Sequence, residues 1–521
     1  MQMTLPSFTN WHVSLSTQDN LTFMNSLKRK TLKRRFLSII VYLLSSTVLS
    51  IQTQFVQANS DYYNLPDLGS SAKNILPSKL ARKVGAAYIR QARSQMEFVD
   101  DPLLLNYLNT LGNKLATVAT ANYPEHQDFT FYLVNDPSIN AFAIPGGHIV
   151  IHTGLILNSK NEQHLAATLA HEIAHITQNH TARSLEKSRY NSAISIASIL
   201  LAAASRSTEA AQAAIIASQG GLLQQQLAYT RGFEREADNS AVRILYQAGY
   251  DPNALTDFLK ILNKKQSLSG SKPPAFLLTH PLTNERISET NQRARAYPVP
   301  AIDPESEFAF ENFKAVIEVE FHAKPATIIK RHTIKKDTLT ASDHLQLGLA
   351  LIKKNQFSKA QSHLNSALQQ YPDNLFFQIA MTDLAVAQQD YQLANQQFER
   401  IKNNDPENYP LIAAYHANAL IISRQNEKAL VVLKQIADNN PNEPLIHILL
   451  ARTYGELELL SNSYQERAQY HYLRGNYAFA IKQLDNALPY TDNPYQKRKI
   501  LSKKESFRNE MLATEAALKK L

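Results

Sequence analysis

The sequence HEIAH, at residues 171–175, decides how the rest of this chain is interpreted. It lies in a segment, residues 162–184, whose apolar side chains recur with helical spacing. On a helix, His171 and His175 project from one face a single turn apart, so both imidazoles can bind one metal ion. Glu172 then lies beside the open coordination position, where a carboxylate can take a proton from a metal-bound water. The stretch therefore predicts a helix that carries a hydrolytic zinc site.

A site of this kind needs a third ligand from another helix, and the sequence FEREAD at residues 233–238 is the best candidate. Glu234 would be the ligand, and Ala237 leaves room for close helix packing. Asp238, four residues after Glu234, shares its face and could accept the free ring N–H of a ligating histidine. The alternative is that the charged residues of this segment form a solvated helix face.

The sequence around these helices predicts a small sheet. Residues 129–134, 139–144 and 148–152 have the composition of strands, and Pro145-Gly146-Gly147 between the last two indicates a hairpin. Helices are expected at residues 78–95 and 101–121. The predicted fold class is therefore α+β, mainly helical with a small β-sheet, over residues 59–297.

After a proline cluster, residues 298–341 are interpreted as a linker with some helix, and residues 342–521 as an all-α domain with an internal period. Small residues and turn prolines recur at spacings of 34 and 35, at Ala360, Ala394 and Ala429 and at Pro372, Pro406 and Pro441. This period is typical of a tetratricopeptide-repeat solenoid, which usually binds peptides or proteins on a concave face. The longer gap between Ala429 and Ala480 implies an inserted helix or an irregular repeat. An unrelated helical bundle is the alternative.

Residues 1–58 have the order of a secretory signal peptide. Six basic residues at 28–35 precede an apolar run at 36–49. Val56 and Ala58 then offer small or β-branched side chains at positions −3 and −1 of a cleavage site. The apolar run is short for a membrane span, which needs about 20 residues, although an uncleaved anchor is the alternative. Translation could begin at Met24. The remaining chain is thus expected to be exported.

Composition narrows the function further. The chain has no cysteine, which excludes a disulfide scaffold, a cysteine-ligated zinc finger and a thiol nucleophile. Of the net charge of +9, residues 1–58 carry +5, from six basic residues and one acidic residue, which leaves +4 for the rest of the chain. No dense run of basic and aromatic residues occurs there, so nucleic acid is not an expected partner.

Three motifs together resemble the gluzincin metallopeptidases related to the prenyl-protein (CAAX) endoprotease and the heat-shock protease HtpX. They are HExxH at 171–175, ExxAD at 234–238 and LTHPLTNERI at 278–287. With a signal peptide before and repeats after them, the chain most resembles the periplasmic β-barrel assembly-enhancing proteases of that group. The resemblance implies a zincin domain with one zinc ion per subunit, held by His171, His175 and Glu234, with Glu172 as general base. It makes His280 a regulatory residue that can occupy the fourth metal position, or one that stabilises the transition state. The alternative for His280 is a core or loop histidine.

The resemblance also implies how substrates bind and what they are. Asn140, Ala141, Phe142 and Ala143 would form an edge strand to which an extended substrate adds. Substrates would be misfolded or stalled outer-membrane proteins in the periplasm, and the repeats would bind the barrel-assembly machinery. The Ala- and Ser-rich segments 194–204 and 210–223 would cover the active site, with peripheral contact to a membrane. A different interpretation is a chaperone-like adaptor whose metal site is structural or latent, although a structural site would have no need of Glu172.

Overall fold

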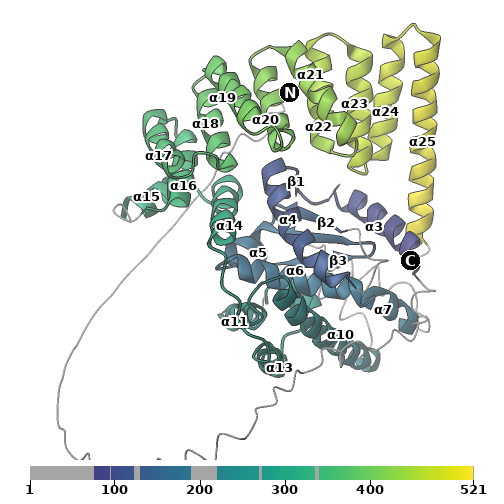
Figure 1. The fold of residues 1–521 in the computed structure, drawn as a ribbon. Coiled ribbons are helices and arrows are strands. Elements are labelled where there is room, and N and C mark those ends of the chain that lie inside the picture. Colours follow the sequence, from purple (N-terminus) through teal and green to yellow (C-terminus); the bar gives the residue numbers. More distant parts are fainter. Residues whose placement is uncertain are drawn as a thin grey trace, which may run out of the picture. The chain divides into compact units, whose positions relative to one another are not determined.

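The computed structural model describes residues 76–93, 95–121, 129–188, 220–268, 273–334 and 339–519. All of them belong to one unit of contacting elements (Figure 1). The expected signal peptide, the segment 194–204 and most of the segment 210–223 lie outside the described residues. Among the described helices, none has the length and apolar character needed to cross a membrane.

A four-stranded sheet lies at the centre of the first domain, in the order β1-β2-β4-β3. The strands are β1 (Phe98–Val99), β2 (Thr130–Val134), β3 (Ala141–Ile144) and β4 (His148–His152). β2 and β4 are parallel, whereas β3 and β4 form an antiparallel hairpin. Gly146 and Gly147 at its turn have φ of 89° and 91°, a region that glycine enters without steric cost. The predicted hairpin is confirmed, and β3 is left at the edge of the sheet.

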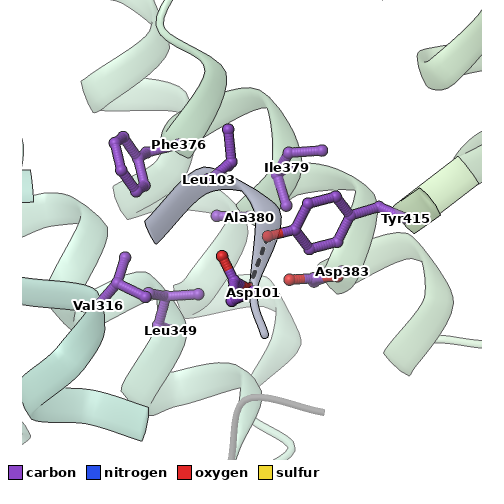
Figure 2. A pocket seen from close by; sticks show the side chains of 9 residues that line it. All are labelled: Asp101, Leu103, Val316, Leu349, Phe376, Ile379, Ala380, Asp383 and Tyr415. Atoms are coloured by element: carbon purple, nitrogen blue, oxygen red, sulfur yellow. Dashed lines mark hydrogen bonds between the residues drawn. The ribbon is translucent and has the colours of Figure 1, made fainter. Parts of the chain in front are cut away.

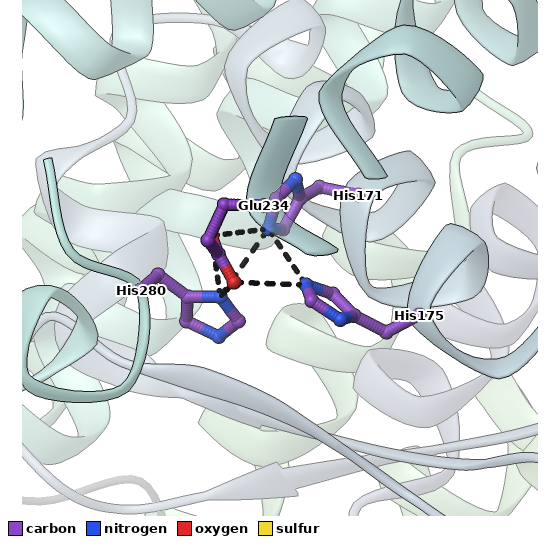
Figure 3. A group of neighbouring side chains, drawn as sticks. All are labelled: His171, His175, Glu234 and His280. Carbon is purple, nitrogen blue, oxygen red and sulfur yellow. Dashed lines mark hydrogen bonds and ion pairs between the residues drawn. The ribbon is translucent and has the colours of Figure 1, made fainter. Parts of the chain in front are cut away.

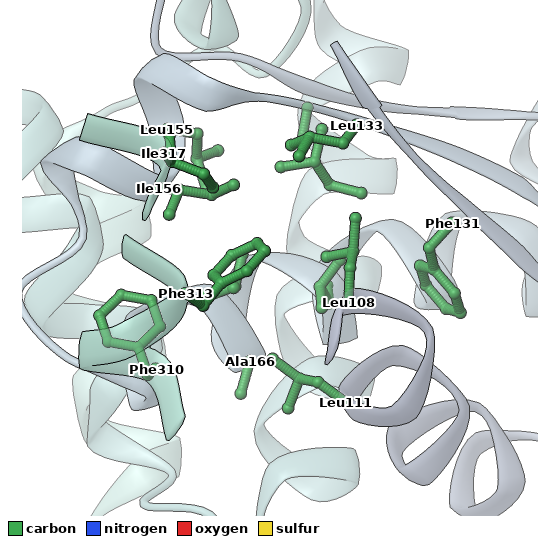
Figure 4. Close-up of a cluster of buried hydrophobic side chains, with 14 of the residues drawn as sticks. Leu108, Leu111, Phe131, Leu133, Leu155, Ile156, Ala166, Phe310, Phe313 and Ile317 are labelled. Carbon is green, nitrogen blue, oxygen red and sulfur yellow. The ribbon is translucent and has the colours of Figure 1, made fainter. Parts of the chain in front are cut away.

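Side chains alternate between the two faces of the sheet, as the two-residue period of a strand requires. Phe131 and Leu133 of β2 enter the main core (Figure 4), which α4 (Pro102–Ala119) and α6 (Glu162–Thr177) help to form. Val134 enters a smaller cluster beneath α3 (Ser78–Ala92). α6 begins where the Asn161 side chain accepts the backbone N–H of His164.

The helical segment expected over residues 162–184 is in fact two helices, which corrects the prediction of one stretch. α6 ends at Thr177, and α7 (His180–Ser188) begins after Asn179, whose φ is 54°. Asparagine tolerates this left-handed conformation better than most residues. The chain therefore turns between His175 and His180.

The other described helices of this domain complete the walls of the site. They are α5 (Thr153–Asn158), α10 (Gly220–Gln247), α11 (Asn253–Leu268), α12 (Phe276–Thr279) and α13 (Asn284–Ala294). α10 packs along α6 and α13, and α11 packs against both α6 and α13.

The segment interpreted as a linker packs as part of the core. It contains α14 (Pro304–Ile317), the π-helix η3 (Glu318–His322) and α15 (Pro325–Ile334). Phe310, Phe313 and Ile317 of α14 are fully buried in the cluster that also holds the residues of α4 and α6 (Figure 4). Their spacing of three and four residues puts all three on one helix face, so α14 joins the two domains through buried apolar surface.

The C-terminal domain is a succession of helices that follows the repeat seen in the sequence, which confirms the predicted all-α repeat architecture. The helices are α16 (Ala341–Ile352), α17 (Phe357–Gln370), α18 (Leu375–Ala387), α19 (Tyr391–Asn404), α20 (Tyr409–Ile422), α21 (Asn426–Asn439), α22 (Pro444–Glu456), α23 (Leu460–Leu473), α24 (Tyr477–Ala487) with the short η5 (Leu488–Tyr490), and α25 (Pro494–Lys519). The turns within the pairs have residues with φ near 60° at regular intervals, namely Asn355, Gln389, Arg424 and Glu458.

The long gap between Ala429 and Ala480 has a simple structural origin. Ser463 on α23, which is buried, takes the small position one repeat length after Ala429. α24 follows half a repeat later and carries Ala480. The gap is therefore one full repeat and the first helix beyond it, with serine in place of alanine at the intervening position.

The repeats contact the first domain through α3 and α4. The Tyr415 hydroxyl of α20 donates a 2.6 Å hydrogen bond to Oδ2 of Asp101, the residue that caps α4 (Figure 2). Beside this bond lies a cavity of about 10 Å³, which is room for about one water molecule. Asp383 of α18 also lines it, and its buried Oδ2 atom has no hydrogen-bond partner. The junction thus brings two carboxyl groups into a largely apolar space.

Candidate active site

Four side chains from separate parts of the chain converge in the first domain (Figure 3). His171 and His175 come from α6, Glu234 comes from α10, and His280 directly follows α12. One donor atom from each lies within 4.8 Å of the other three. The structure therefore brings together the two histidines of the HEIAH sequence, the carboxylate selected from the FEREAD sequence and the histidine of the third motif.

The spacing of these atoms fits a tetrahedral metal site. Nε2 of His171 is 3.1 Å from Nε2 of His175 and 3.3 Å from Nδ1 of His280. The Glu234 carboxylate is 3.0 Å from the His280 nitrogen and 3.4 Å from the nitrogens of the other two histidines. Ligands bound to zinc at about 2.0–2.1 Å in tetrahedral geometry are about 3.3 Å apart. The four residues could hold a zinc ion with little movement.

The Glu172 carboxyl faces the same space. Its Oε1 atom is 3.4 Å from Nε2 of His280, and the carboxyl accepts a hydrogen bond from the backbone of Ala143 in β3. Burial raises the pKa of Glu172 to about 8, although the neighbouring His171 opposes this effect. A bound cation would lower this pKa again, because it favours the carboxylate. The Glu172 carboxyl thus lies beside the converging donor atoms, where a carboxylate can accept a proton.

Asp238 and Arg286 form a buried polar network with His171 and Glu234. Asp238 Oδ1 is 3.0 Å from Nδ1 of His171, which is the contact that its position on the helix face predicted. Arg286 of α13 donates to Asp238 through Nε (2.6 Å) and Nη2 (2.8 Å), and its Nη1 lies 2.8 Å from Glu234. Burial would raise the pKa of both carboxyls, but the Arg286 charge, with the histidines around them, holds each below its ordinary value. Both groups therefore stay ionised.

His280 is buried and stacks on Phe276, with ring centroids 4.4 Å apart. Burial lowers the pKa of His280 to about 4, although Glu234 opposes this effect. A neutral ring can offer a lone pair to a metal. Its Nδ1 is one of the four converging donor atoms.

The segment selected as a substrate strand lies next to Glu172. Ala141, Phe142 and Ala143 pair with β4 through one edge of β3, and Asn140, just before β3, accepts a hydrogen bond from the backbone N–H of His152. Within the described ranges, no strand pairs with the other edge of β3. The backbone of β3 beside Glu172 thus lies at an edge of the sheet.

Two residues of this site were not singled out from the sequence. His180 lies with its Nδ1 2.8 Å from Nδ1 of His175, and Arg286 binds two carboxylates. Arg286 is part of the quoted LTHPLTNERI segment, but nothing in that segment shows that its guanidinium is buried. His180 would point away from His175 if the helix continued without a break.

Residues 102–294 match peptidase family M48, and residues 344–374 match a tetratricopeptide repeat. A Yersinia pestis protein named beta-barrel assembly-enhancing protease is 33% identical over 463 residues, which are 86% of this chain and 93% of that protein. This chain belongs to the β-barrel assembly-enhancing protease family. The Escherichia coli K12 member is 31% identical over 431 residues, 81% of this chain and 86% of its own length. The family resemblance and the two-domain fold class are therefore confirmed, and the chain is a metallopeptidase with a repeat domain.

A more distant relative matches a shorter region. The mitochondrial metalloendopeptidase OMA1 of Schizosaccharomyces pombe is 34% identical over 161 residues, which are 31% of this chain and 45% of that protein. This match is shorter than the region that fits the peptidase family, residues 102–294.

Proposed function

We propose that this chain is a zinc-dependent endopeptidase with one zinc ion per subunit, held by His171, His175 and Glu234. The observation that carries the proposal is the set of 3.0–3.4 Å separations among the donor atoms, with the Glu172 carboxyl against the same space. Three protein ligands and an adjacent carboxylate are the donor set of hydrolytic zinc sites.

When bound, zinc supplies a Lewis acid that polarises the scissile carbonyl and lowers the pKa of a water molecule. Glu172 accepts the proton of the attacking water on its carboxylate and then passes it to the leaving amine nitrogen. Arg286 and Asp238 keep Glu234 and His171 oriented during this exchange.

His280 would make the enzyme latent. With zinc held by the other three ligands, its Nδ1 would take the position of a metal-bound water, and its Nε2 lies 3.4 Å from Glu172. Movement of the segment after α12 would remove the ring from that position and admit water and substrate. Once displaced, the same imidazole could donate to the tetrahedral oxyanion.

An extended substrate segment would add to the free edge of β3, next to Ala143 and Glu172. Main-chain hydrogen bonds would then hold the substrate, which favours unfolded segments over particular side chains. The relatives are named β-barrel assembly-enhancing proteases, which supports a role in β-barrel assembly. Misassembled outer-membrane barrels would be the substrates, and the repeats would bind the barrel-assembly machinery. This role requires export to the periplasm through residues 1–58, and peripheral membrane contact is consistent with it.

A second function is favoured by the closed fourth corner of the site. A protein that keeps His280 in this position would act as a chaperone-like adaptor with a latent metal site. The two functions differ in whether Glu172 is ever used.

The test compares Glu172→Gln with the exposed Glu285→Gln as a matched control, both in the full chain carrying His280→Ala. Zinc content is measured by elemental analysis, and proteolysis is measured on casein and on an unfolded β-barrel protein. We expect Glu172→Gln to retain one zinc and to lose at least about 100-fold in rate, which is the usual scale for a general base. Unchanged proteolysis by Glu172→Gln would overturn the mechanism, and retention of zinc by His171→Ala would overturn the ligand set.

A further inference from the structure

We infer that His180 is a positioning residue that accepts the Nδ1–H of His175 and connects that imidazole to the Glu236–Arg183 ion pair. The inference rests on the proposed zinc site, because it concerns the side of His175 that faces away from the metal.

The contact is short and buried. Nδ1 of His180 lies 2.8 Å from Nδ1 of His175, and His180 is only 4% exposed. The His180 ring stacks on Phe233 of α10, with centroids 4.3 Å apart and an interplanar angle of 23°. Phe233 immediately precedes Glu234, so the surface that holds the His180 ring belongs to the helix that supplies the third ligand.

The break between α6 and α7 creates this contact. Five residues of continuous α-helix would rotate His180 by about 500° relative to His175, which places it about 140° around the helix axis. Asn179, with φ of 54°, lies between α6 and α7, and the turn at this residue brings His180 back toward His175. A residue in the left-handed region costs free energy unless it is asparagine or glycine, so the turn uses a residue type suited to it.

The protons in this contact follow from the geometry. Nε2 of His175 lies among the other donor atoms, 3.1 Å from His171 Nε2 and 3.4 Å from Glu234, and must offer its lone pair there. A neutral His175 therefore carries its proton on Nδ1 and donates it. His180 must then accept at Nδ1 and carry its own proton on Nε2.

That second proton points toward a carboxylate. Nε2 of His180 is 3.5 Å from Oε2 of Glu236, a distance at which the interaction is electrostatic rather than a formed hydrogen bond. Arg183 of α7 lies 2.8 Å and 2.9 Å from the two oxygens of Glu236. The charge of Glu236 favours the tautomer of His180 that keeps Nδ1 free to accept.

The two ligating histidines are thus supported in parallel ways. Nδ1 of His171 lies 3.0 Å from Asp238, which Arg286 holds. His175 reaches a carboxylate and an arginine through one additional imidazole. Partners of this kind fix the tautomer and the ring orientation of a ligating histidine and raise its basicity, and their loss typically weakens metal binding by about 10–100-fold.

The test measures the zinc dissociation constant of the full chain by competition with a chelator. His180→Leu removes the acceptor, whereas His180→Asn keeps a carbonyl oxygen near the position of Nδ1. His363→Leu is the control, because His363 forms a similar contact with His344, 2.9 Å between Nδ1 atoms, within the repeats. We expect His180→Leu to bind zinc about 10–100-fold more weakly, His180→Asn to recover most of that loss and His363→Leu to match the unaltered chain.

A second measurement uses the unaltered chain, so it is informative even if the His180 variants fail to fold. Nitrogen NMR of the zinc-loaded chain should show His180 protonated at Nε2 and unprotonated at Nδ1. Unchanged affinity in His180→Leu, equal losses in the leucine and asparagine variants, or a proton on Nδ1 of His180 would each overturn the inference. If the unaltered chain binds no zinc, the proposed function fails first, whereas zinc binding with any of these results overturns the role of His180 alone.

Discussion

Asp383, at the junction of the two domains, should make the stability of the protein depend on pH. Its carboxyl lines the cavity beside Asp101, among Leu103, Phe376 and Ile379 (Figure 2). Burial, reinforced by the Asp101 charge, raises the pKa of Asp383 from 3.8 to about 7, although the ammonium of Lys353 opposes this rise. The folded protein therefore holds this proton at pH values where the unfolded chain has released it.

The sign and the size follow from this difference. Between pH 4 and pH 7 the folded state binds more protons at this site than the unfolded state, so stability falls as pH rises through this range. A pKa that differs by about 3 between the two states corresponds to about 4 kcal/mol, which is an upper bound for one coupled carboxyl. Asp383→Asn keeps a neutral group of similar size and should be more stable than the unaltered chain at pH 8, by up to this amount.

The assay is urea unfolding of both proteins, followed by circular dichroism, at pH values from 4.5 to 8. Asp373→Asn is the matched control, because Asp373 is exposed and lies in the turn just before α18, the helix that carries Asp383. The difference in unfolding free energy between Asp383→Asn and the unaltered chain should grow with pH up to about 7 and then level off. A difference that stays constant across this range, or that has the opposite sign, would refute the reasoning.

Three further changes test other parts of the molecule. His280→Ala should raise casein proteolysis and weaken zinc binding, because the imidazole leaves the fourth corner; lower activity would instead assign His280 to the transition state. Arg286→Lys should weaken zinc binding by about tenfold or more in chelator competition, because an ammonium cannot bind Asp238 and Glu234 in the same fork geometry. Gly475→Ala should lower the unfolding free energy by about 2–4 kcal/mol, since φ is 72° and a Cβ atom would overlap the Arg90 carbonyl. Gly455→Ala should not, because a Cβ atom there would meet only the Ser463 hydroxyl, at an ordinary contact distance.

The parts of the site that depend on local geometry could be predicted from the sequence. The spacing of His171 and His175 places them on one face of any α-helix, and the same rule relates Glu234 to Asp238. The alternation of β2 and the glycines of the hairpin likewise depend on short-range rules. The distance between Glu234 and the histidines depends on how two separate helices pack. The sequence could therefore identify Glu234 as a candidate ligand but could not give that distance.

Other features lacked a local signal. Arg286 is one of many arginines in the chain, and only the burial of its side chain beside two carboxylates reveals its role. His180 was hidden by the expectation of an unbroken helix, because a single asparagine is weak evidence for a turn. Ser463 gives no such signal, because a serine interrupts the series of alanines that marks the repeat.

The segment containing α14 differs from these cases, because its sequence does contain the pattern of a buried helix. Three prolines favoured a linker, yet Phe310, Phe313 and Ile317 have the spacing of a buried helix face. Pro304 itself lies in the first turn of α14, where proline is well tolerated, so one of the residues that suggested a boundary in fact starts a helix.

The separation of the metal-binding atoms is ultimately set by the packing of α10 on α6. Ala237 and Ala241 of α10, like Ala170 and Ala174 of α6, are fully buried, and small side chains let two helix axes approach closely. At that distance the Glu234 side chain spans the remaining gap to the two histidines, while Asp238 reaches the opposite edge of His171. The outer contact of His171 comes from Asp238 of α10, which Arg286 of α13 holds, and that of His175 comes from His180 of α7. The site is therefore assembled by the packing of several helices, and no single helix carries all four donor atoms.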